Sequence, residues 1–487
     1  MHKFLTLEGI LLILGYLALA FLIVWFISLF KYKNDDETRK YFFLGFFFKI
    51  ACCIGYAVIY DFYYGWAGDT YSYFWSSIRL GKVLFQDPSS YFSIMLDTID
   101  KTNINTLPSG LAYYPVFRDP SKYALHRFLS PFAIIGGENY YTVNICLAVF
   151  TYLLNWKFFR YIRTKINCSN KFTFICIMMI PSVGFWSSAI MKDSFTFTFN
   201  LVFVMCFAKI FFDRKIRIST IFGLLLSAYI VMELKVYILY AAIAGCMVWL
   251  GSGYLKKVKS ALFKFIVAPL LIGIVALGGM YALSFVGSNV GGTFSDVDSM
   301  LNQASVTQQD LKQEYYQGHA FDIGDFDGSL GSLISMGPKA IIAGLYRPFI
   351  FESGSAVMLL SGLENTVLLL LTLYVFFKAG IKYTIKQILG NPFVSMCFLF
   401  SIVLALGIGI STSNFGALVR FKIPLIPFFA LGWLEILSSK RKEDEAIVAE
   451  EALLQFVDDT SLEYRWPKTT CRRARRTCRG LPSRILG

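Results

Sequence analysis

Residues 171–208, KFTFICIMMIPSVGFWSSAIMKDSFTFTFNLVFVMCFA, contain two apolar runs that are separated by a short segment carrying Lys192 and Asp193. Each run approaches the length of about 20 residues that a helix needs to cross a hydrocarbon core about 30 Å thick. The pattern predicts two membrane helices, 171–190 and 194–211, joined by a tight turn. Ionisable residues are costly at a membrane boundary unless they pair or line a wet cavity, so this turn needs a structural explanation.

The rest of the chain repeats the apolar pattern. It has 487 residues, of which 56% are hydrophobic and 16% are charged, whereas about a quarter of the residues in a soluble domain are charged. The composition predicts an all-α integral membrane protein, since a β-barrel would show short alternating segments instead. About 11 transmembrane helices are expected from the apolar runs. The expected spans are 8–30, 41–60, 138–156, 171–190, 194–211, 218–234, 236–252, 265–285, 356–377, 392–411 and 421–438.

Basic residues determine the expected orientation in the membrane. Every second connection is short and rich in Lys and Arg, as cytoplasmic connections are. These connections lie at 31–40, 157–165, 209–217, 256–264, 378–386 and 440–442. The N-terminus is therefore predicted outside and the C-terminus inside. The same bias accounts for the net charge of +14, so no nucleic-acid partner is expected.

The chain is predicted to have three parts. Residues 1–40 form an extra N-terminal helix with a basic loop, 41–438 form a polytopic membrane core, and 439–487 form a charged cytoplasmic tail. Two long segments of the core, 61–137 and 286–355, fall on the outer face. Both contain short helical patterns and loop signals rather than membrane spans.

Ionisable residues recur at the predicted outer ends of the spans. Each has a simpler explanation as a turn, a helix cap or a headgroup anchor, but their shared level favours one common polar site. Cations at a membrane surface suit a phosphate or diphosphate group, and a carboxylate beside it suits general-base work on a sugar hydroxyl. The residues are Asp61, Asp69, Lys192, Asp193, Glu233, Lys235, Arg347, Glu352, Arg420 and Lys422.

Four motifs carry a resemblance to a known family. They are GDTYSY at 68–73, PSVGFWSSAIMKDS at 181–194, LYRPFIFE at 345–352 and VRFKIPLIPF at 419–428. On these motifs the chain resembles, over about 41–438, the bacterial membrane glycosyltransferases of the GT-C superfamily, in particular members from surface-polysaccharide loci. It departs from them in having an extra N-terminal span and in lacking a paired Asp-Glu in the first outer segment.

The resemblance implies a GT-C-like fold and a set of roles. Asp69 would be the catalytic base, Asp193 the second acidic position, and Arg420 a phosphate-binding residue. Lys192, Lys235 and Arg347 are expected to bind phosphate as well. The partners would be membrane lipids, a polyprenyl-phosphate-linked or polyprenyl-diphosphate-linked sugar donor, and a glycan acceptor, at the outer face of the bacterial cytoplasmic membrane. Some members of the superfamily need a divalent metal and others do not, so metal dependence stays open.

Three alternatives remain. An O-antigen or capsule polymerase, or a ligase, would give the leading roles to Arg347, Arg420 and His319. A transporter of a lipid-linked glycan or anionic solute would place polar groups and broken helices near the membrane midplane. A scaffold would dock partners on the outer segment 286–355. Within that segment Asp322, Asp325 and Asp327 match the spacing of a calcium loop poorly, and a solvated turn is expected there.

Overall fold

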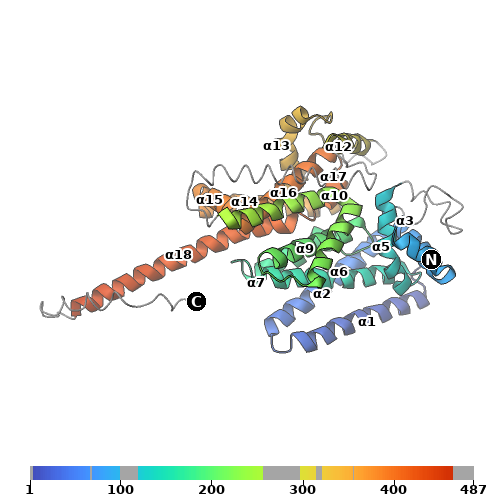
Figure 1. Cartoon of the computed structure of the whole chain (residues 1–487), viewed down its shortest axis with the longest axis horizontal. Coiled ribbons are helices and arrows are strands. Elements are labelled where there is room, and N and C mark those ends of the chain that lie inside the picture. Colours follow the sequence, from blue (N-terminus) through green and yellow to red (C-terminus); the bar gives the residue numbers. More distant parts are fainter. Residues whose placement is uncertain are drawn as a thin grey trace. The chain divides into compact units, whose positions relative to one another are not determined.

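The protein is built from helices. The computed structural model describes residues 4–65, 68–98, 119–255, 297–313, 321–354 and 356–463, and no strand occurs in these ranges (Figure 1). Seven of the described helices are long and apolar enough to cross a membrane, or eight if one bent pair counts as a single span. The predicted class, an all-α membrane protein, is confirmed. The expected number of about 11 stays a prediction, and the span at 265–285 lies outside the described residues.

The chain divides into two compact units, residues 1–436 and 437–487. In the first unit, α1 is followed by α2, whose last turns widen into a π-helical turn at Ile59–Tyr63. The helices of the first half are α1 (Leu7–Lys31), α2 (Asp36–Val58), α3 (Asp69–Gln86), α4 (Pro88–Met95), α5 (Pro120–Gly136), α6 (Tyr140–Ile162), α7 (Asn170–Phe174), α8 (Pro181–Trp186) and α9 (Lys192–Phe211). The later helices are α10 (Ile218–Leu255), α12 (Val297–Leu311), α13 (Leu330–Tyr346), α14 (Ala356–Ala379), α15 (Ile381–Gly390), α16 (Pro392–Ser411), α17 (Phe415–Phe421) and α18 (Ile426–Glu463).

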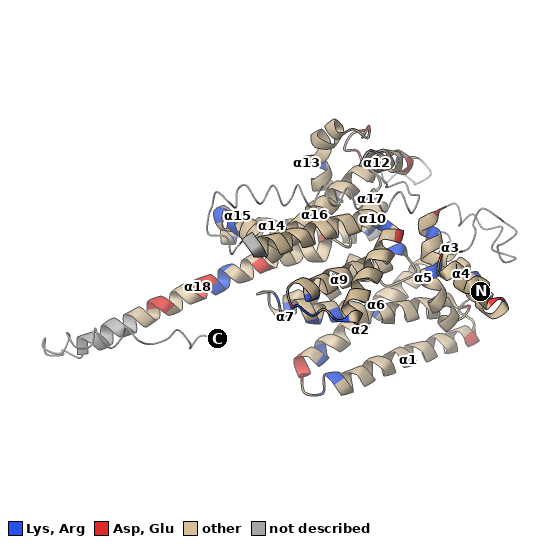
Figure 2. Ribbon diagram, in the orientation of Figure 1, with Lys and Arg blue, Asp and Glu red and all other residues tan. Residues whose placement is uncertain are grey.

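Charged residues are concentrated near the ends of these helices. Figure 2 shows that Lys, Arg, Asp and Glu gather mainly at helix ends in the first unit, while the shafts of α1, α9 and α16 are almost free of them. The core runs through α9, which packs against α6 and α10, and α10 packs in turn against α16. In the most apolar window of α9, 83% of the residues are buried, against 17% in α1. α9 is therefore a central helix and α1 a peripheral one.

The segment 61–137, which is predicted to face outward, contains a small packed unit. α3 packs against α4 and α5, and the three helices share a buried apolar cluster. α5 begins at a clear signal, because Asp119 caps its first backbone amides and Pro120 occupies its first position, where the missing N–H costs nothing. The cluster consists of Leu80, Val83, Tyr91, Ile94 and Tyr123.

The segment 171–190 does not form the continuous span that the apolar run predicted. α7 passes into a π-helical turn at Ile175–Met179, the chain becomes extended at Ile180, and the short helix α8 follows. The physical reason is Pro181, which cannot donate to the preceding turn and forces the residue before it out of helical geometry. The span is thus broken shortly before Lys192.

α10 covers the two predicted spans 218–234 and 236–252 and leaves helical geometry at Lys235, where φ is −153° and ψ is 78°. The ring of Trp249, near its end, lies 4.7 Å from the ring of Phe212, which follows α9 just before α10 begins. A straight helix would carry Trp249 about 46 Å away from Ile218. α10 therefore turns back at Lys235, and this corner comes to the N-terminal end of α9.

The second segment predicted to face outward, 286–355, also contains helices. α12 and α13 both pack against α16. α13 lies so close to α16 that a Cβ added at Gly409 would come within 2.0 Å of the Ala340 carbonyl oxygen, and one added at Gly344 within 2.3 Å of the Ala405 carbonyl oxygen. Small residues let membrane helices touch backbone to backbone in this way. After α16 the predicted span 421–438 is bent, with 61° between α17 and α18.

The second unit contains the end of α18. Its charged sequence supports the helix through pairs one turn apart, Lys440 with Asp444 and Arg441 with Glu445. The tail is helical as far as Glu463. The basic end of the tail, 464–487, lies outside the described residues.

Candidate functional site

A cavity of about 400 Å³ lies where eight helices meet, at the level predicted to face outward. It is lined by α3, α5, α12 and α13, which belong to the two segments predicted to face outward, and by parts of α9, α10, α16 and α17. Its lining includes four cations, Lys122, Lys192, Lys235 and Arg420, and one carboxylate, that of Asp69. The remaining lining residues are Tyr73, Leu234, Tyr237, Leu301, Gln303, Ala304, Thr307, Leu333, Gly407, Ile410, Ser411 and Phe421.

The contacts of Asp193 explain why charged residues stand at the start of α9. Its side chain is 1% exposed, and Oδ1 accepts a hydrogen bond from Lys235 Nζ at 2.5 Å while Oδ2 lies 3.4 Å from Arg420 Nη2. The three residues come from α9, the corner of α10 and α17. Asp193 also lies in the first turn of α9, where the helix dipole favours a negative charge. The buried carboxylate thus holds two cavity cations in place and is not itself part of the described lining.

Arg420 keeps hydrogen-bonding capacity for a ligand. Its guanidinium carbon lies 5.4 Å from the centre of the Trp186 ring. Nη2 contacts Asp193, whereas the buried Nε has no hydrogen-bond partner among the described residues. A buried donor without a partner marks a place where a ligand or water completes the structure. An arginine fork with unused N–H groups on a cavity wall suits an oxyanion such as phosphate.

Lys192 and Lys122 are organised by the start of α5. Lys192 Nζ donates to Ser121 Oγ at 2.5 Å, and Ser121 Oγ donates to Asp119 Oδ1 at 2.8 Å. Burial alone would raise the pKa of Asp119, but the charge of Lys192 and the hydrogen bonds from Ser121 hold that pKa below its usual value. Asp119 is therefore ionised near neutral pH. It orients the Lys192 ammonium group toward the cavity through Ser121.

His126 lies behind the same wall, one turn further along α5. Its ring centre is 5.7 Å from that of Tyr73, and its Nε2 has no hydrogen-bond partner among the described residues. Burial lowers the pKa of His126 to about 3, and the positive charge of Lys192 acts in the same direction. The imidazole is therefore neutral at physiological pH and adds no charge to the site.

Asp69 differs from Asp193 in its surroundings. It is the first residue of α3 and follows Gly68, whose φ of 99° lies in the left-handed region. An added Cβ at Gly68 would also come within 3.3 Å of the Tyr60 ring. No hydrogen bond or ion pair joins Asp69 to another described residue, so its carboxylate is available to a bound molecule. Tyr73, one turn later on the same face, lines the cavity beside it.

The convergence predicted for the phosphate-binding residues is found for Lys192, Lys235 and Arg420. Arg347 does not join them among the described lining residues. Its Nε donates to Glu352 Oε1 at 2.9 Å, and its guanidinium carbon lies 4.7 Å from the Phe321 ring centre. Glu352, five residues away in sequence, pairs with Arg347 and neutralises its charge. Arg347 instead links the segment 286–355 to the start of α17, since its guanidinium carbon also lies 5.4 Å from the Phe415 ring centre.

Other ionisable residues expected at this level form contacts between helices. Glu233 pairs with the buried Arg127 of α5 at 3.0 Å, and Asp61 accepts a hydrogen bond from the Tyr141 hydroxyl at 2.9 Å. Lys422 donates to the Arg347 carbonyl oxygen at 3.1 Å and also bonds to Asn365. These contacts link neighbouring helices around the cavity, which explains why the residues occur at one level without sharing one site.

Two contributions to the cavity could not be inferred from the sequence patterns. Lys122 lies in the DPSK sequence at the start of α5, where the Asp-Pro pair is a visible helix-start signal, but nothing local shows that this helix faces α9. The second is α12, whose polar sequence predicts a helix without indicating what it covers.

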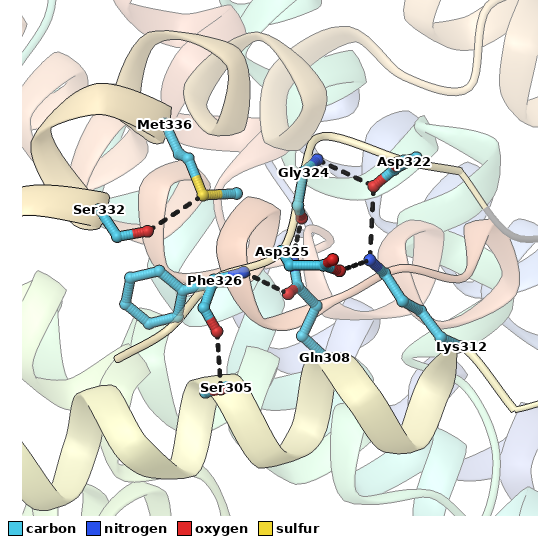
Figure 3. Close-up of polar contacts among 9 residues, drawn as sticks. All are labelled: Ser305, Gln308, Lys312, Asp322, Gly324, Asp325, Phe326, Ser332 and Met336. Carbon is cyan, nitrogen blue, oxygen red and sulfur yellow. Dashed lines mark hydrogen bonds and ion pairs between the residues drawn. The ribbon is translucent and has the colours of Figure 1, made fainter. Parts of the chain in front are cut away.

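The acidic segment after α12 forms turns. Asp322 accepts the backbone amide of Gly324, and Lys312 pairs with both Asp322 and Asp325 (Figure 3). Asp327 accepts the backbone amide of Ser329. Within the part of the chain that the structure describes, no group of three or more His, Cys, Asp or Glu side chains could hold a metal ion.

No protein-family model matches the chain, and neither a curated protein nor a solved structure is detectably similar to it. The function must therefore be inferred from the chemistry of the cavity.

Proposed function

We propose that the protein is a membrane glycosyltransferase. It uses a polyprenyl-phosphate-linked or polyprenyl-diphosphate-linked sugar donor on the outer face of the bacterial cytoplasmic membrane, in the assembly of a surface glycan. The observation that carries the proposal is that two carboxylates at the cavity have different surroundings. Asp193 is buried behind the wall and holds Lys235 and Arg420. Asp69 lines the same cavity, makes no hydrogen bond or ion pair with a described residue, and interacts electrostatically with Lys192 and Arg420.

The charge of the site fits a phosphate ester. Lys122, Lys192, Lys235 and Arg420 line the cavity, so cations outnumber the single lining carboxylate by four to one. Asp193 and Asp119 lie behind the wall and offset part of this positive charge. The cavity stays positive, and the repulsion between its cations is reduced. Apolar lining residues from α10, α12, α13 and α16 suit the adjoining lipid chain.

The chemistry that this arrangement supports is a direct displacement. Asp69 accepts the proton of an acceptor hydroxyl as its oxygen forms a bond to the anomeric carbon of the donor sugar. The bond between that carbon and the phosphate oxygen breaks, and its electron pair leaves with the lipid phosphate. Arg420 and the lysines stabilise the charge that accumulates on the departing phosphate, which is the role of preorganised cations in such transfers.

The experiment is complementation of a strain from which the gene has been deleted, with surface and lipid-linked glycans as the measurement. Asp69→Asn should abolish glycan production at normal protein level, because Asn keeps the shape and loses the proton acceptor. Asp87→Asn is the matched control, since Asp87 caps α4 on the surface and Asn caps helices equally well. Full activity of Asp69→Asn would remove the assignment of the base.

A second candidate function is a transporter of a lipid-linked glycan or an anionic solute. The observation that favours it is the broken segment 170–191, since discontinuous helices are typical of transporter binding sites. Glu364 of α14 accepts the Ser182 amide at the break at 2.9 Å. Transport predicts that Asp69→Asn retains activity while substitutions at the break abolish it, so the same strain separates the two functions.

The geometry gives less support to the polymerase or ligase alternative. It gives leading roles to Arg347, Arg420 and His319. Arg347 is paired with Glu352, and His319 lies outside the described residues. Of the three residues, Arg420 alone is found in the described cavity wall.

A further inference from the structure

α12 supplies a wall of the cavity that differs chemically from the others. The cations lie on α5, α9, α10 and α17, and the carboxylate of Asp69 lies on α3. The face of α12 that lines the cavity carries Leu301, Gln303, Ala304 and Thr307, which are all uncharged. A substrate that fills the cavity therefore meets cations from four helices and a neutral side-chain amide from α12.

The position of α12 is held by specific hydrogen bonds. The side-chain amide of Gln308 is 1% exposed and uses both ends, donating Nε2 to the Gly324 carbonyl at 3.1 Å and accepting the Phe326 amide at 2.9 Å (Figure 3). Ser305 Oγ donates to the Phe326 carbonyl at 2.7 Å, and Lys312 pairs with two Asp residues of the same turn segment. These contacts fix the helix in rotation as well as in distance.

The segment that clamps α12 is tied to the cationic wall. The Phe321 amide donates to the Ser413 carbonyl oxygen at 2.8 Å, and the Phe321 ring stacks on that of Phe415 with 4.8 Å between centres. Phe415 begins α17, the helix that carries Arg420. The neutral face of α12 is thereby set at a defined distance from the phosphate-binding arginine.

Gln303 is oriented within this wall and keeps free capacity. Thr307 Oγ1 donates to the Gln303 carbonyl oxygen at 2.7 Å and lies 3.4 Å from Gln303 Nε2. The Thr307 hydroxyl is thus committed, whereas Oε1 and the second N–H of the Gln303 side chain make no hydrogen bond to a described residue. A primary amide offers both an acceptor and a donor, which matches the hydroxyl groups of a sugar better than a phosphate diester, which has acceptors only.

We infer that Gln303, positioned by Thr307 and the clamped α12, contacts the hydroxyl groups of the sugar and so determines which sugar the site accepts. The inference rests on the proposed function and adds the orientation of the substrate in the cavity. The phosphate lies against Arg420 and the lysines, and the sugar lies against α12. Thr307 is a positioning residue in this scheme, because its hydroxyl acts through Gln303.

The test uses the full-length protein in lipid nanodiscs and isothermal titration calorimetry with defined probes. The probes are inorganic phosphate and the 1-phosphates of glucose, galactose, mannose and N-acetylglucosamine. At least one sugar phosphate should bind about tenfold more tightly than inorganic phosphate. Gln303→Ala should weaken that sugar phosphate about five- to tenfold, the value of one or two neutral hydrogen bonds, and leave inorganic phosphate within about twofold.

The control is Gln309→Ala, which removes the same side chain from the exposed side of α12 and should change neither affinity. If no sugar phosphate binds more tightly than inorganic phosphate, or if Gln303→Ala weakens both equally, the inference is overturned while the phosphate site stands. If inorganic phosphate does not bind, or binds equally well to Arg420→Lys, the proposed function fails first and the inference falls with it.

Discussion

Replacing Asp193 by Asn should destabilise the folded protein, because it leaves two buried cations without their counter-charge. The side chains of Asp193 and Lys235 are 1% and 8% exposed and are joined at 2.5 Å. Removing one partner of such a pair typically costs about 3–5 kcal/mol, since the remaining charge stays desolvated. Arg420 is 3.4 Å away and 23% exposed, so its share of the loss should be smaller than that of Lys235.

The pairing is measured by a double-mutant cycle. Asp193→Asn and Lys235→Gln should each lower the free energy of unfolding, and the double variant should cost less than their sum by about 2–3 kcal/mol. The assay is reversible unfolding in mixed detergent micelles with increasing sodium dodecyl sulfate, followed by far-ultraviolet circular dichroism. Asp444→Asn, in the exposed pair with Lys440, is the control and should leave the unfolding free energy unchanged within error.

Additive costs would refute this reasoning. If the double variant equals the sum of the single variants within about 0.5 kcal/mol, the two charges do not interact. Asp193 would then be free to act as a proton acceptor, and its role as a holder of cations would have to be abandoned. Asp69→Asn provides the contrast, because its side chain makes no hydrogen bond or ion pair with a described residue and its loss should leave the unfolding curve in place.

Three further predictions concern the cavity and its surroundings. Arg420→Lys should weaken inorganic phosphate binding about tenfold in calorimetry by removing the bidentate fork, whereas Arg347→Lys should leave it within about twofold; equal effects would place Arg347 at the site after all. Val306→Cys, which replaces a residue that is 58% exposed on α12, should react with a membrane-impermeant maleimide in intact cells above the unsubstituted background, and Glu450→Cys in α18 should react only after permeabilisation; the reverse pattern inverts the topology. Since burial lowers the pKa of His126 to about 3, the unfolded chain takes up a proton below about pH 6.5 that the folded chain refuses, so stability should fall as the pH drops from about 6.5 to 3. His126→Gln should flatten that decline in unfolding curves recorded at intervals across the range, and an unchanged slope would exclude His126 as its source.

Several elements of this fold are visible in the sequence because their causes are local. The apolar run 392–411 coincides with α16 (Pro392–Ser411), and the start of α9 at Lys192 lies within two residues of the expected span. The break before α8 also has a local cause, since Pro181 directly follows the apolar run that begins the expected span. Run length alone predicts one continuous helix there, but the proline decides the structure.

The site shows where local patterns stop being informative. Arg347 and Arg420 occupy similar positions, each in a short sequence with a following proline. They differ in the carboxylates that they contact. Arg347 pairs with Glu352, five residues away, whereas Arg420 lies beside Asp193, which is 227 positions away in the sequence. Such long-range choices depend on how the helices pack. The same holds for Lys122 and the face of α12, whose sequences show that they are helical without showing what they face.

The distance in sequence between Asp193 and Arg420 has a consequence for how the protein is made. The cavity takes residues from position 69 to position 421, so a nascent chain that has inserted everything through α16 still lacks the arginine. Asp193 and Lys235 can meet earlier, because α9 and α10 are neighbours in the order of synthesis. The site is therefore completed only when α17 emerges. A polypeptide released between α16 and α17 would carry Asp69 and all three lining lysines but not Arg420. Under the proposed function such an incomplete product would be inactive.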